Sequence, residues 1–348
     1  MRRKIRLTNN LRGIVWATFL KNMTQIFNEN IFKVGRQSFN QYAIDIFHFQ
    51  YQHNPVYRNF SDSLRVIPEE VKTIFQIPFL PIDLFKSFPI QTTIFNPEII
   101  FESSGTTQSV PSRHYVKDLS IYRNSYLRGF EKFYGPVDEW CVIGLLPSYL
   151  ERDHSSLVTM VDDLIRMSHH PGSGFYLYEY DQLFQLLTRL EKEHQKTWLI
   201  GVTFALVDFA EKFSMKLNNT VVMETGGMKG RQKEITRAAL HSLLKERLGL
   251  NQVHSEYGMT ELLSQAYSKS NGIFESVPWM KTLVRNDDDP REVHESGEGI
   301  LNIIDLANIF SCSFIATEDV GRIDRDGMFE VLGRTDNSDI RGCSLLAI

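Results

Sequence analysis

The sequence lacks the features that mark several classes of protein. Its 38 Lys and Arg residues are balanced by 42 Asp and Glu residues, and no basic block offers the surface that a nucleic acid needs. No window holds the ~18 consecutive apolar residues of a membrane-spanning helix. The three cysteines, Cys141, Cys312 and Cys343, lie far apart and include no CxxC pair for zinc. These absences predict a cytoplasmic protein with no nucleic-acid partner and no integral membrane segment.

The length leaves room for a large hydrophobic core. At roughly 150 residues per domain, the 348 residues predict two domains or one large α/β unit. Residues 1–22 begin with a basic and then an apolar stretch, but no cleavage site of a signal peptide follows. We interpret them as a non-native or misassigned extension, with Met23 as the alternative start, because an amphipathic pattern begins just after it.

Helix and strand patterns alternate through most of the chain. Helical spacing over 38–49 predicts a helical entry layer, and the prolines of 78–97 then predict short extended pieces. The predicted strands are 99–102, 140–146, 198–202, 219–223, 252–254 and 299–304. The predicted helices are 118–133, 155–167, 181–195 and 231–248, the last capped by Gly249. Such alternation predicts an α/β sheet fold.

A first segment with candidate chemistry follows the strand at 99–102 and reads Glu102-Ser-Ser-Gly-Thr-Thr-Gln-Ser109. A loop of small residues exposes backbone N–H groups, and glycine permits positive φ. The candidate phosphate-binding residues are Ser103, Ser104, Gly105, Thr106 and Thr107. No GKT or GKS follows, which disfavours a P-loop NTPase. An ordinary Ser/Thr-rich turn is the alternative.

Two more segments follow predicted strands. In Glu224-Thr-Gly-Gly-Met-Lys-Gly-Arg231, the pair Gly226 and Gly227 lets a ring or a phosphate approach the backbone, and Lys229 can hold an anion. A tight turn with solvated basic residues is the alternative. Ser255-Glu-Tyr-Gly-Met-Thr-Glu261 combines four chemistries within five residues. These are Tyr257 for stacking on a base, Gly258 for close approach, Thr260 for a phosphate and Glu261 as a hard oxygen ligand for Mg²⁺.

A fourth segment runs from Ala316 to Asp336. Asp326-Gly327 lies between two extended pieces and predicts a hairpin turn. Asp319 lies outside that turn and is a candidate acceptor for two ribose hydroxyls. Taken singly, Asp319 and Arg334 would more often be surface groups than ligands.

In this order, the four segments resemble the adenylate-forming superfamily of acyl-CoA synthetases, nonribosomal adenylation domains and luciferases. The resemblance implies an α/β fold, the large N-terminal-type domain of that superfamily, with mixed sheets flanked by helices plus a small barrel. It implies ATP and Mg²⁺ as cofactors and a carboxylic acid as substrate. It makes 103–107 the phosphate loop, Gly226 and Gly227 the adenine turn, 257–261 the stacking, phosphate and magnesium motif, Asp319 the ribose ligand and Arg334 the residue before the hinge.

The chain departs from that pattern in three places. Arg113 stands where the superfamily has a lysine after its phosphate loop, and Thr317-Glu-Asp319 replaces Thr-Gly-Asp. The mobile C-terminal domain, whose lysine assists adenylation in relatives, is missing or reduced to a stub. We therefore expect charge stabilisation from Mg²⁺, Arg113 or Lys229, and from backbone donors.

Within the superfamily, the chain is most similar to LuxE-type acyl-protein synthetases. The residues that carry this narrower resemblance are Leu146-Pro-Ser-Tyr-Leu-Glu-Arg-Asp-His-Ser-Ser156, the 224–231 segment and Asp339-Ile-Arg-Gly-Cys-Ser-Leu-Leu346. Such enzymes activate a fatty acid as acyl-AMP, pass the acyl group to a cysteine of their own, and work beside a reductase and a transferase. The resemblance implies a catalytic domain at 23–334 and a tail at 335–348 that carries the acceptor Cys343.

A free thiol is only a few per cent ionised at pH 7, so Cys343 needs a basic or cationic neighbour. His154, His114 and Arg341 are the candidate activators. A plain buried role for Cys343 stays open, whereas Cys141 and Cys312 lie in apolar runs and are predicted to be core. Two other functions also stay open: a synthetase that loads CoA or a carrier protein, and a noncatalytic nucleotide-binding partner protein.

Overall fold

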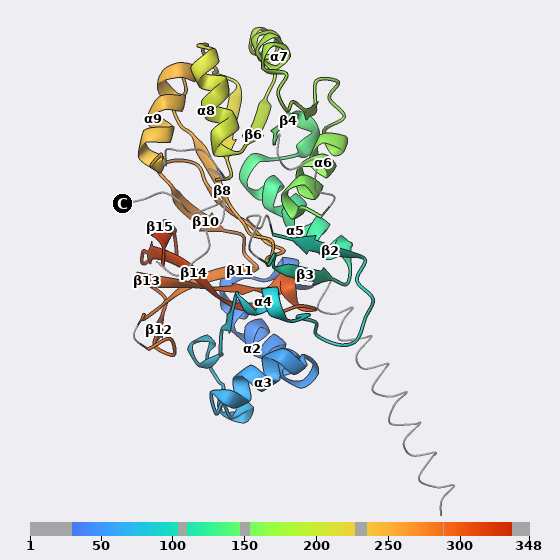
Figure 1. Cartoon of the computed structure of the whole chain (residues 1–348), viewed down its shortest axis with the longest axis vertical. Helices are drawn as coiled ribbons and strands as arrows, with labels where there is room; N and C mark the ends of the chain where they lie inside the picture. The colour runs from blue at the N-terminus through green and yellow to red at the C-terminus, as the bar shows by residue number, and fades with distance from the viewer. Residues whose placement is uncertain (1–29, 104–109, 147–153, 227–234, 288, 336–348) are drawn as a thin grey trace, which may run out of the picture.

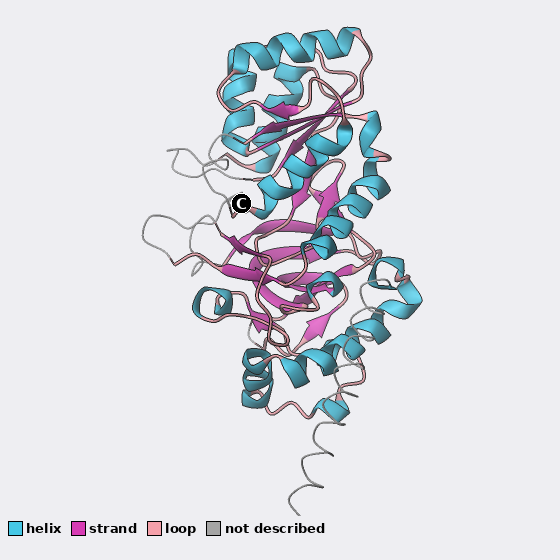
Figure 2. Cartoon of the chain, turned by 90° about the vertical axis from the view of Figure 1, so that its right-hand side faces the viewer, coloured by secondary structure: helices cyan, strands magenta, loops and turns pink. Residues whose placement is uncertain are grey.

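The computed structural model describes residues 30–103, 110–146, 154–226, 235–287 and 289–335. Across these residues it shows a mixed α/β fold in which thirteen strands form one sheet, while β2 (Ile99–Glu102) and β3 (Arg113–Val116) pair with each other. The sheet is flanked by helices at both ends of the molecule (Figure 2). This confirms the predicted fold class, a mixed sheet flanked by helices.

The first described residues form a helical layer at one end of the molecule (Figure 1). Its elements are η1 (Ile31–Lys33), α2 (Arg36–His53), α3 (Pro55–Ser63), η2 (Pro68–Glu70) and η3 (Ile74–Gln76). They are followed by β1 (Leu80–Pro81), which pairs with β14 in the sheet, and by α4 (Leu84–Ser87). Asn54 ends α2 and caps α3, where its side chain accepts a hydrogen bond from Tyr57 N at 3.0 Å. The Gln50 amide donates to the carbonyls of Asn308 and Ile309, each at 3.0 Å, and thus ties this layer to the far end of the chain.

The middle of the chain builds a parallel sheet. Its strands are β4 (Cys141–Leu145), β5 (Gly174–Phe175), β6 (Thr197–Gly201), β7 (Thr220–Glu224) and β8 (His254–Tyr257), in the order β5-β4-β6-β7-β8. The accompanying helices are α5 (Leu119–Tyr134), η4 (Val137–Glu139), α6 (Ser156–Ser168), α7 (Tyr180–Lys192), α8 (Thr203–Lys212) and α9 (Arg237–Leu248). Strands β4 and β6 are buried at every residue, as expected for a parallel sheet that is covered on both faces.

The last part of the chain continues the same sheet with antiparallel strands. They are β9 (Ala266–Ser268), β10 (Ile273–Ser276), β11 (Met280–Arg285), β12 (Val293–His294), β13 (Gly297–Asp305), β14 (Phe314–Ile323) and β15 (Phe329–Arg334), with η5 (Leu306–Asn308) after β13. The predicted hairpin joins β14 to β15, and Gly327 has φ 83° in its turn. Their register places Asp319 opposite Arg334, fifteen residues apart in the chain.

Most predicted elements agree with the structure to within a few residues, and two differ. The strand predicted at 252–254 is observed as β8, because pairing with β7 and β9 extends it through Tyr257. The helix predicted from residue 231 begins at Arg237, because the Thr236 side chain accepts from Ala239 N at 3.2 Å and caps it there.

Other expectations about single residues are confirmed. Gly249 ends α9 in the left-handed conformation, with φ 60°. Cys141 and Cys312 are both fully buried in the core. Among the described residues, no helix is both long and apolar enough to cross a membrane.

Candidate functional site

A pocket lies where the carboxyl ends of β7 and β8 meet strands β14 and β15. Parallel strands release their loops at the same edge of a sheet, and the register pairs Glu224 with Ser255 at that edge. Seven of the predicted site residues line the pocket: Ser103, Tyr257, Gly258, Thr260, Glu261, Asp319 and Arg334. Two segments that are widely separated in the sequence, 255–261 and 316–336, therefore share one cavity with Ser103, the first residue of the predicted phosphate loop.

The Asp319 carboxylate is held by two donors. It accepts from the Tyr257 hydroxyl at 2.8 Å and from Arg334 Nε at 2.9 Å, and its side chain is almost completely buried. Its backbone N–H donates to Thr317 Oγ1 at 3.1 Å, which fixes the strand at this point. A carboxylate has about four acceptor positions, so two held donors leave capacity for two hydroxyl groups of a ligand.

The loop after β8 is anchored through its backbone. The Thr260 carbonyl lies 2.8 Å from His114 Nδ1, and the Glu261 carbonyl accepts from Asn308 Nδ2 at 2.7 Å. These bonds leave the Thr260 and Glu261 side chains in the pocket wall. Just beyond, the buried Asp305 carboxylate accepts from Leu263 N at 2.8 Å, and burial raises its pKa to about 6.

The Glu261 carboxylate fits Mg²⁺ by type, because this ion prefers hard oxygen ligands. Its residue is only 2% exposed, yet it lines the pocket. No group of three His, Cys, Asp or Glu side chains among the described residues could hold a metal. A Mg²⁺ ion held by Glu261 would therefore take its other ligands from phosphate and water, as this ion commonly does.

The turn after β7 is shaped by the buried Glu224. Its carboxylate accepts from Gly226 N at 2.9 Å, and Gly226 has φ 73°. Burial acts to raise the pKa of Glu224, but the hydrogen bond to His241 and the charge of Arg237 outweigh it and lower the pKa. Thr225 lines the pocket from this turn, whereas Gly226 is outside the lining.

Several predicted residues lie beside the pocket or outside the described residues. Arg113 is half exposed and pairs with Glu102, Nε to Oε1 at 3.2 Å, and only Glu102 lines the pocket. His154 is exposed next to Ser155, which does line it. The roles of Arg113 and His154 stay predictions. Outside the described residues lie Ser104, Gly105, Thr106, Thr107, Gly227, Lys229, Arg341 and Cys343.

His114, a candidate thiol activator, is poorly placed for that role. It is 1% exposed, its ring packs edge-on against Phe85, and burial lowers its pKa to about 4. It is therefore neutral at pH 7 and acts on the pocket through the Thr260 carbonyl.

The pocket also contains polar residues that the sequence did not single out, chiefly Glu256 and Gln265. Burial and the nearby charge of Glu224 raise the pKa of Glu256 to about 8. The local sequence shows only an acidic residue within a strand at Glu256. The burial that raises its pKa depends on helices from elsewhere in the chain.

A family model described as acyl-protein synthetase, LuxE, matches residues 30–347. The chain belongs to the LuxE acyl-protein synthetase family. This agrees with the narrower resemblance that its segments show. No curated protein matches it in sequence.

Solved structures share the fold of this LuxE-family chain. ATP-bound MatB from Rhodopseudomonas palustris is 18% identical, with a TM-score of 0.51 over 70% of this chain and 50% of MatB. A 2-hydroxyisobutyryl-CoA ligase in its postadenylation state, in complex with R3-HIB-AMP, is 14% identical, with a TM-score of 0.62 over 88% of this chain and 69% of the ligase. The chain thus spans about half the length of MatB.

Proposed function

We propose that this protein activates a fatty acid with ATP, releases pyrophosphate, and passes the acyl group from acyl-AMP to the Cys343 thiol. The observation that carries the proposal is the shared pocket, where Tyr257, Thr260, Glu261 and Asp319 meet. Membership of the LuxE family and the ATP bound to the similarly folded MatB support it. In this proposal, residues 23–334 form the catalytic domain and 335–348 carry the acceptor.

In this proposal, different pocket residues contact the ribose, the base and the phosphates of ATP. Asp319 accepts the ribose hydroxyls, and the hydrogen bond from Arg334 orients that carboxylate. Tyr257 and the 226–227 turn border the base. The hydroxyls of 103–107 and of Thr260 bind phosphate oxygens, with Arg113 and Lys229 as additional cations.

Adenylation requires positioning more than acid–base chemistry. A carboxylate oxygen of the acid attacks the α-phosphorus, a P–O bond forms, and the bond from that phosphorus to the bridging oxygen breaks as pyrophosphate leaves. The nucleophile is already ionised, so no protein base is needed. Glu261 would hold Mg²⁺, which would neutralise part of the phosphate charge when bound.

The pocket lining includes apolar surface that suits an acyl chain. This surface comes from Ile82, Tyr122, Leu157 and Met160. Burying a methylene group is worth about 0.8 kcal/mol, so an apolar wall of this kind favours a fatty acid over a short polar one.

In the second step, the Cys343 sulfur attacks the acyl carbon. A C–S bond forms, AMP leaves with the C–O bonding electrons, and the thiol proton passes to solvent. His154 is the candidate group that favours the thiolate.

The test is incubation with ATP, Mg²⁺ and a series of straight-chain fatty acids, followed by pyrophosphate release and intact mass. We expect the wild type to release pyrophosphate and to gain the mass of one acyl group. Cys343→Ala should still release pyrophosphate but gain no mass, with Cys343→Ser as the size-matched control. A mass gain that persists in Cys343→Ala would assign the acyl group to another acceptor.

The fold shared with a CoA ligase favours one second candidate, transfer of the acyl group to CoA. The same incubation with CoA distinguishes it. Acyl-CoA that forms at the same rate in wild type and Cys343→Ala supports the synthetase, whereas acyl-protein without acyl-CoA supports the first proposal.

A further inference from the structure

The pocket wall contains two polar side chains whose hydrogen-bonding capacity is unused within the described part of the chain. Glu256 lies in β8, and no described side chain or backbone group hydrogen-bonds to its carboxyl group. Gln265 is 4% exposed, and its Oε1 has no described partner. Both side chains lie against Gly258, where a methyl group would overlap Glu256 Oε1 and touch Gln265 Cγ. Unpartnered polar groups are costly to bury, so a ligand that pairs with them gains affinity.

The pocket lining also contains apolar side chains from two helices. They are Tyr122 from α5 together with Leu157 and Met160 from α6. The Tyr122 hydroxyl donates to the Ser156 carbonyl at 2.9 Å and so joins the two helices beside the pocket. Glu256 therefore shares the pocket with these apolar side chains.

Among the described residues, the titratable groups that face Glu256 and influence its titration carry no positive charge. They are Tyr122 and Tyr134 from α5, Tyr267 from β9 and Glu224 from β7. Burial raises the pKa of each of these tyrosines, which are therefore neutral, and Glu224 is ionised. A second negative charge at Glu256 is disfavoured both by burial and by Glu224, so this carboxyl group is protonated at neutral pH.

We propose that Glu256 is a substrate-binding residue whose carboxyl group donates a hydrogen bond to the carboxylate of the acid substrate. Gln265 supports it as a second, uncharged polar group in the same wall. In its ionised form, Glu256 would instead repel an anionic substrate. The inference rests on the proposed function, because it takes this pocket as the acid-binding site.

The experiment compares wild type with Glu256→Gln, which keeps the size of the side chain and stays neutral at every pH. The KM for decanoate is measured by pyrophosphate release from pH 7 to pH 9.5. Because the pKa of Glu256 is about 8, the neutral fraction falls about 30-fold over this range, and the wild-type KM should rise by about the same factor. The KM of Glu256→Gln should change less than about threefold over the same pH range, because its amide does not titrate.

A rise in KM that is equally steep in Glu256→Gln would overturn the inference, since titration of any other group affects both proteins alike. If no acid yields pyrophosphate in either protein, the proposed function fails. Binding of decanoate, measured by calorimetry across the same pH range, then tests Glu256 directly. If the variant does not fold, the measurement is made on wild type alone. Loss of affinity toward pH 9.5 supports the inference, whereas unchanged affinity or no binding at pH 7 overturns it.

Discussion

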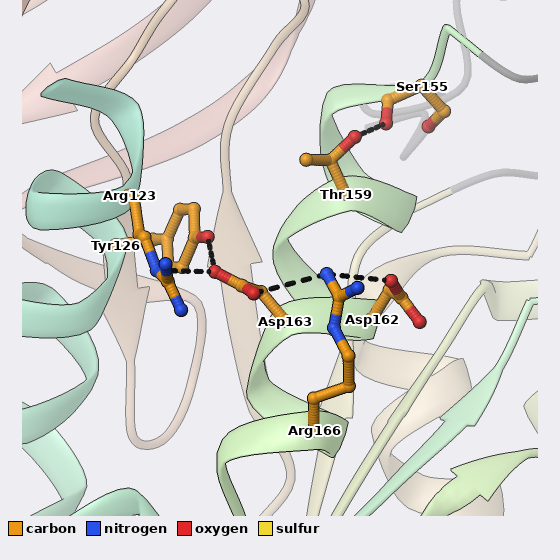
Figure 3. Close-up of polar contacts among 7 residues, drawn as sticks. All are labelled: Arg123, Tyr126, Ser155, Thr159, Asp162, Asp163 and Arg166. Atoms are coloured by element: carbon orange, nitrogen blue, oxygen red, sulfur yellow. Dashed lines mark hydrogen bonds and ion pairs between the residues drawn. The ribbon is translucent and has the colours of Figure 1, made fainter. Parts of the chain in front are cut away.

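Two buried carboxylates, Asp163 and Asp319, have nearly the same partners and lie in different parts of the molecule. Asp163 lies on α6 and binds the Tyr126 hydroxyl and the guanidinium groups of Arg123 and Arg166 (Figure 3). Asp319 lies on β14 and binds the Tyr257 hydroxyl and Arg334. Each acid thus accepts hydrogen bonds from one tyrosine and at least one arginine.

What differs is the position of these partners relative to the pocket. Asp319, Tyr257 and Arg334 all line it, and the arginine side chain is only 14% exposed. The Asp163 group instead joins α5 to α6 on the side that faces solvent, where the Arg123 and Arg166 side chains are more than half exposed. The same chemistry therefore lines the pocket in one place and holds two helices together in the other.

The largest expected effect is that of Asp319→Asn on ATP binding. The amide loses the charge and part of the acceptor capacity that two ribose hydroxyls need, and hydrogen bonds to charged groups contribute about 1.5–3 kcal/mol. We expect the KM for ATP to rise about 100-fold, with the pyrophosphate assay as the measurement. An unchanged KM would mean that the two acids do not differ in function.

The next largest effect is that of Asp163→Asn on stability. The charge that Arg123 and Arg166 share is lost, while the Tyr126 hydroxyl keeps an acceptor. We expect the free energy of unfolding, measured by urea denaturation, to fall by about 2 kcal/mol. The KM for ATP of the folded variant should stay within about twofold of wild type, and a rise comparable to that of Asp319→Asn would contradict the comparison.

A matched pair of tyrosine variants sharpens the contrast. Tyr126→Phe and Tyr257→Phe each remove one hydroxyl donor from a buried carboxylate, and each should lower the free energy of unfolding by about 1 kcal/mol. Only Tyr257→Phe should raise the KM for ATP, about fivefold, because only its carboxylate faces the pocket. Equal KM values in the two variants would remove the distinction.

The smallest effect is expected at the edge of the Asp163 group. Asp162 is 46% exposed and pairs with Arg166 at 3.0 Å. Exposed ion pairs contribute little, so Asp162→Asn should change the free energy of unfolding by no more than about 0.5 kcal/mol. A loss as large as that of Asp163→Asn would show that the arginine, rather than burial of the acid, determines the stability of the group.

Much of the fold followed from local patterns. The periodicity of apolar residues predicted α5 and α6 to within a residue or so at each end, because both helices bury one face against the sheet. The strand β8 was displaced in the prediction, since its polar Glu256 interrupts the apolar run that the pattern follows. Sheet pairing on both sides extends the strand regardless of that side chain.

The sequence predicted residues of the candidate site only where those residues belong to a recognisable motif. Tyr257, Glu261 and Asp319 belong to segments whose order resembles a known superfamily, and the structure brings them into one pocket. Asp163 belongs to no such segment, and Glu256 lies within the 255–261 segment but was assigned no role from the sequence. Their burial, partners and charge depend on helices and strands that lie far away in the chain.

The sequence by itself determined the alternation of helices and strands, the order of the chemical segments and the burial of Cys141 and Cys312. These follow from local periodicity, from residue type and from short apolar runs. Only the tertiary structure decided which carboxylates reach the pocket and which of them are neutral. Desolvation and neighbouring charges set both properties, and folding alone brings the distant residues that cause them close to one another.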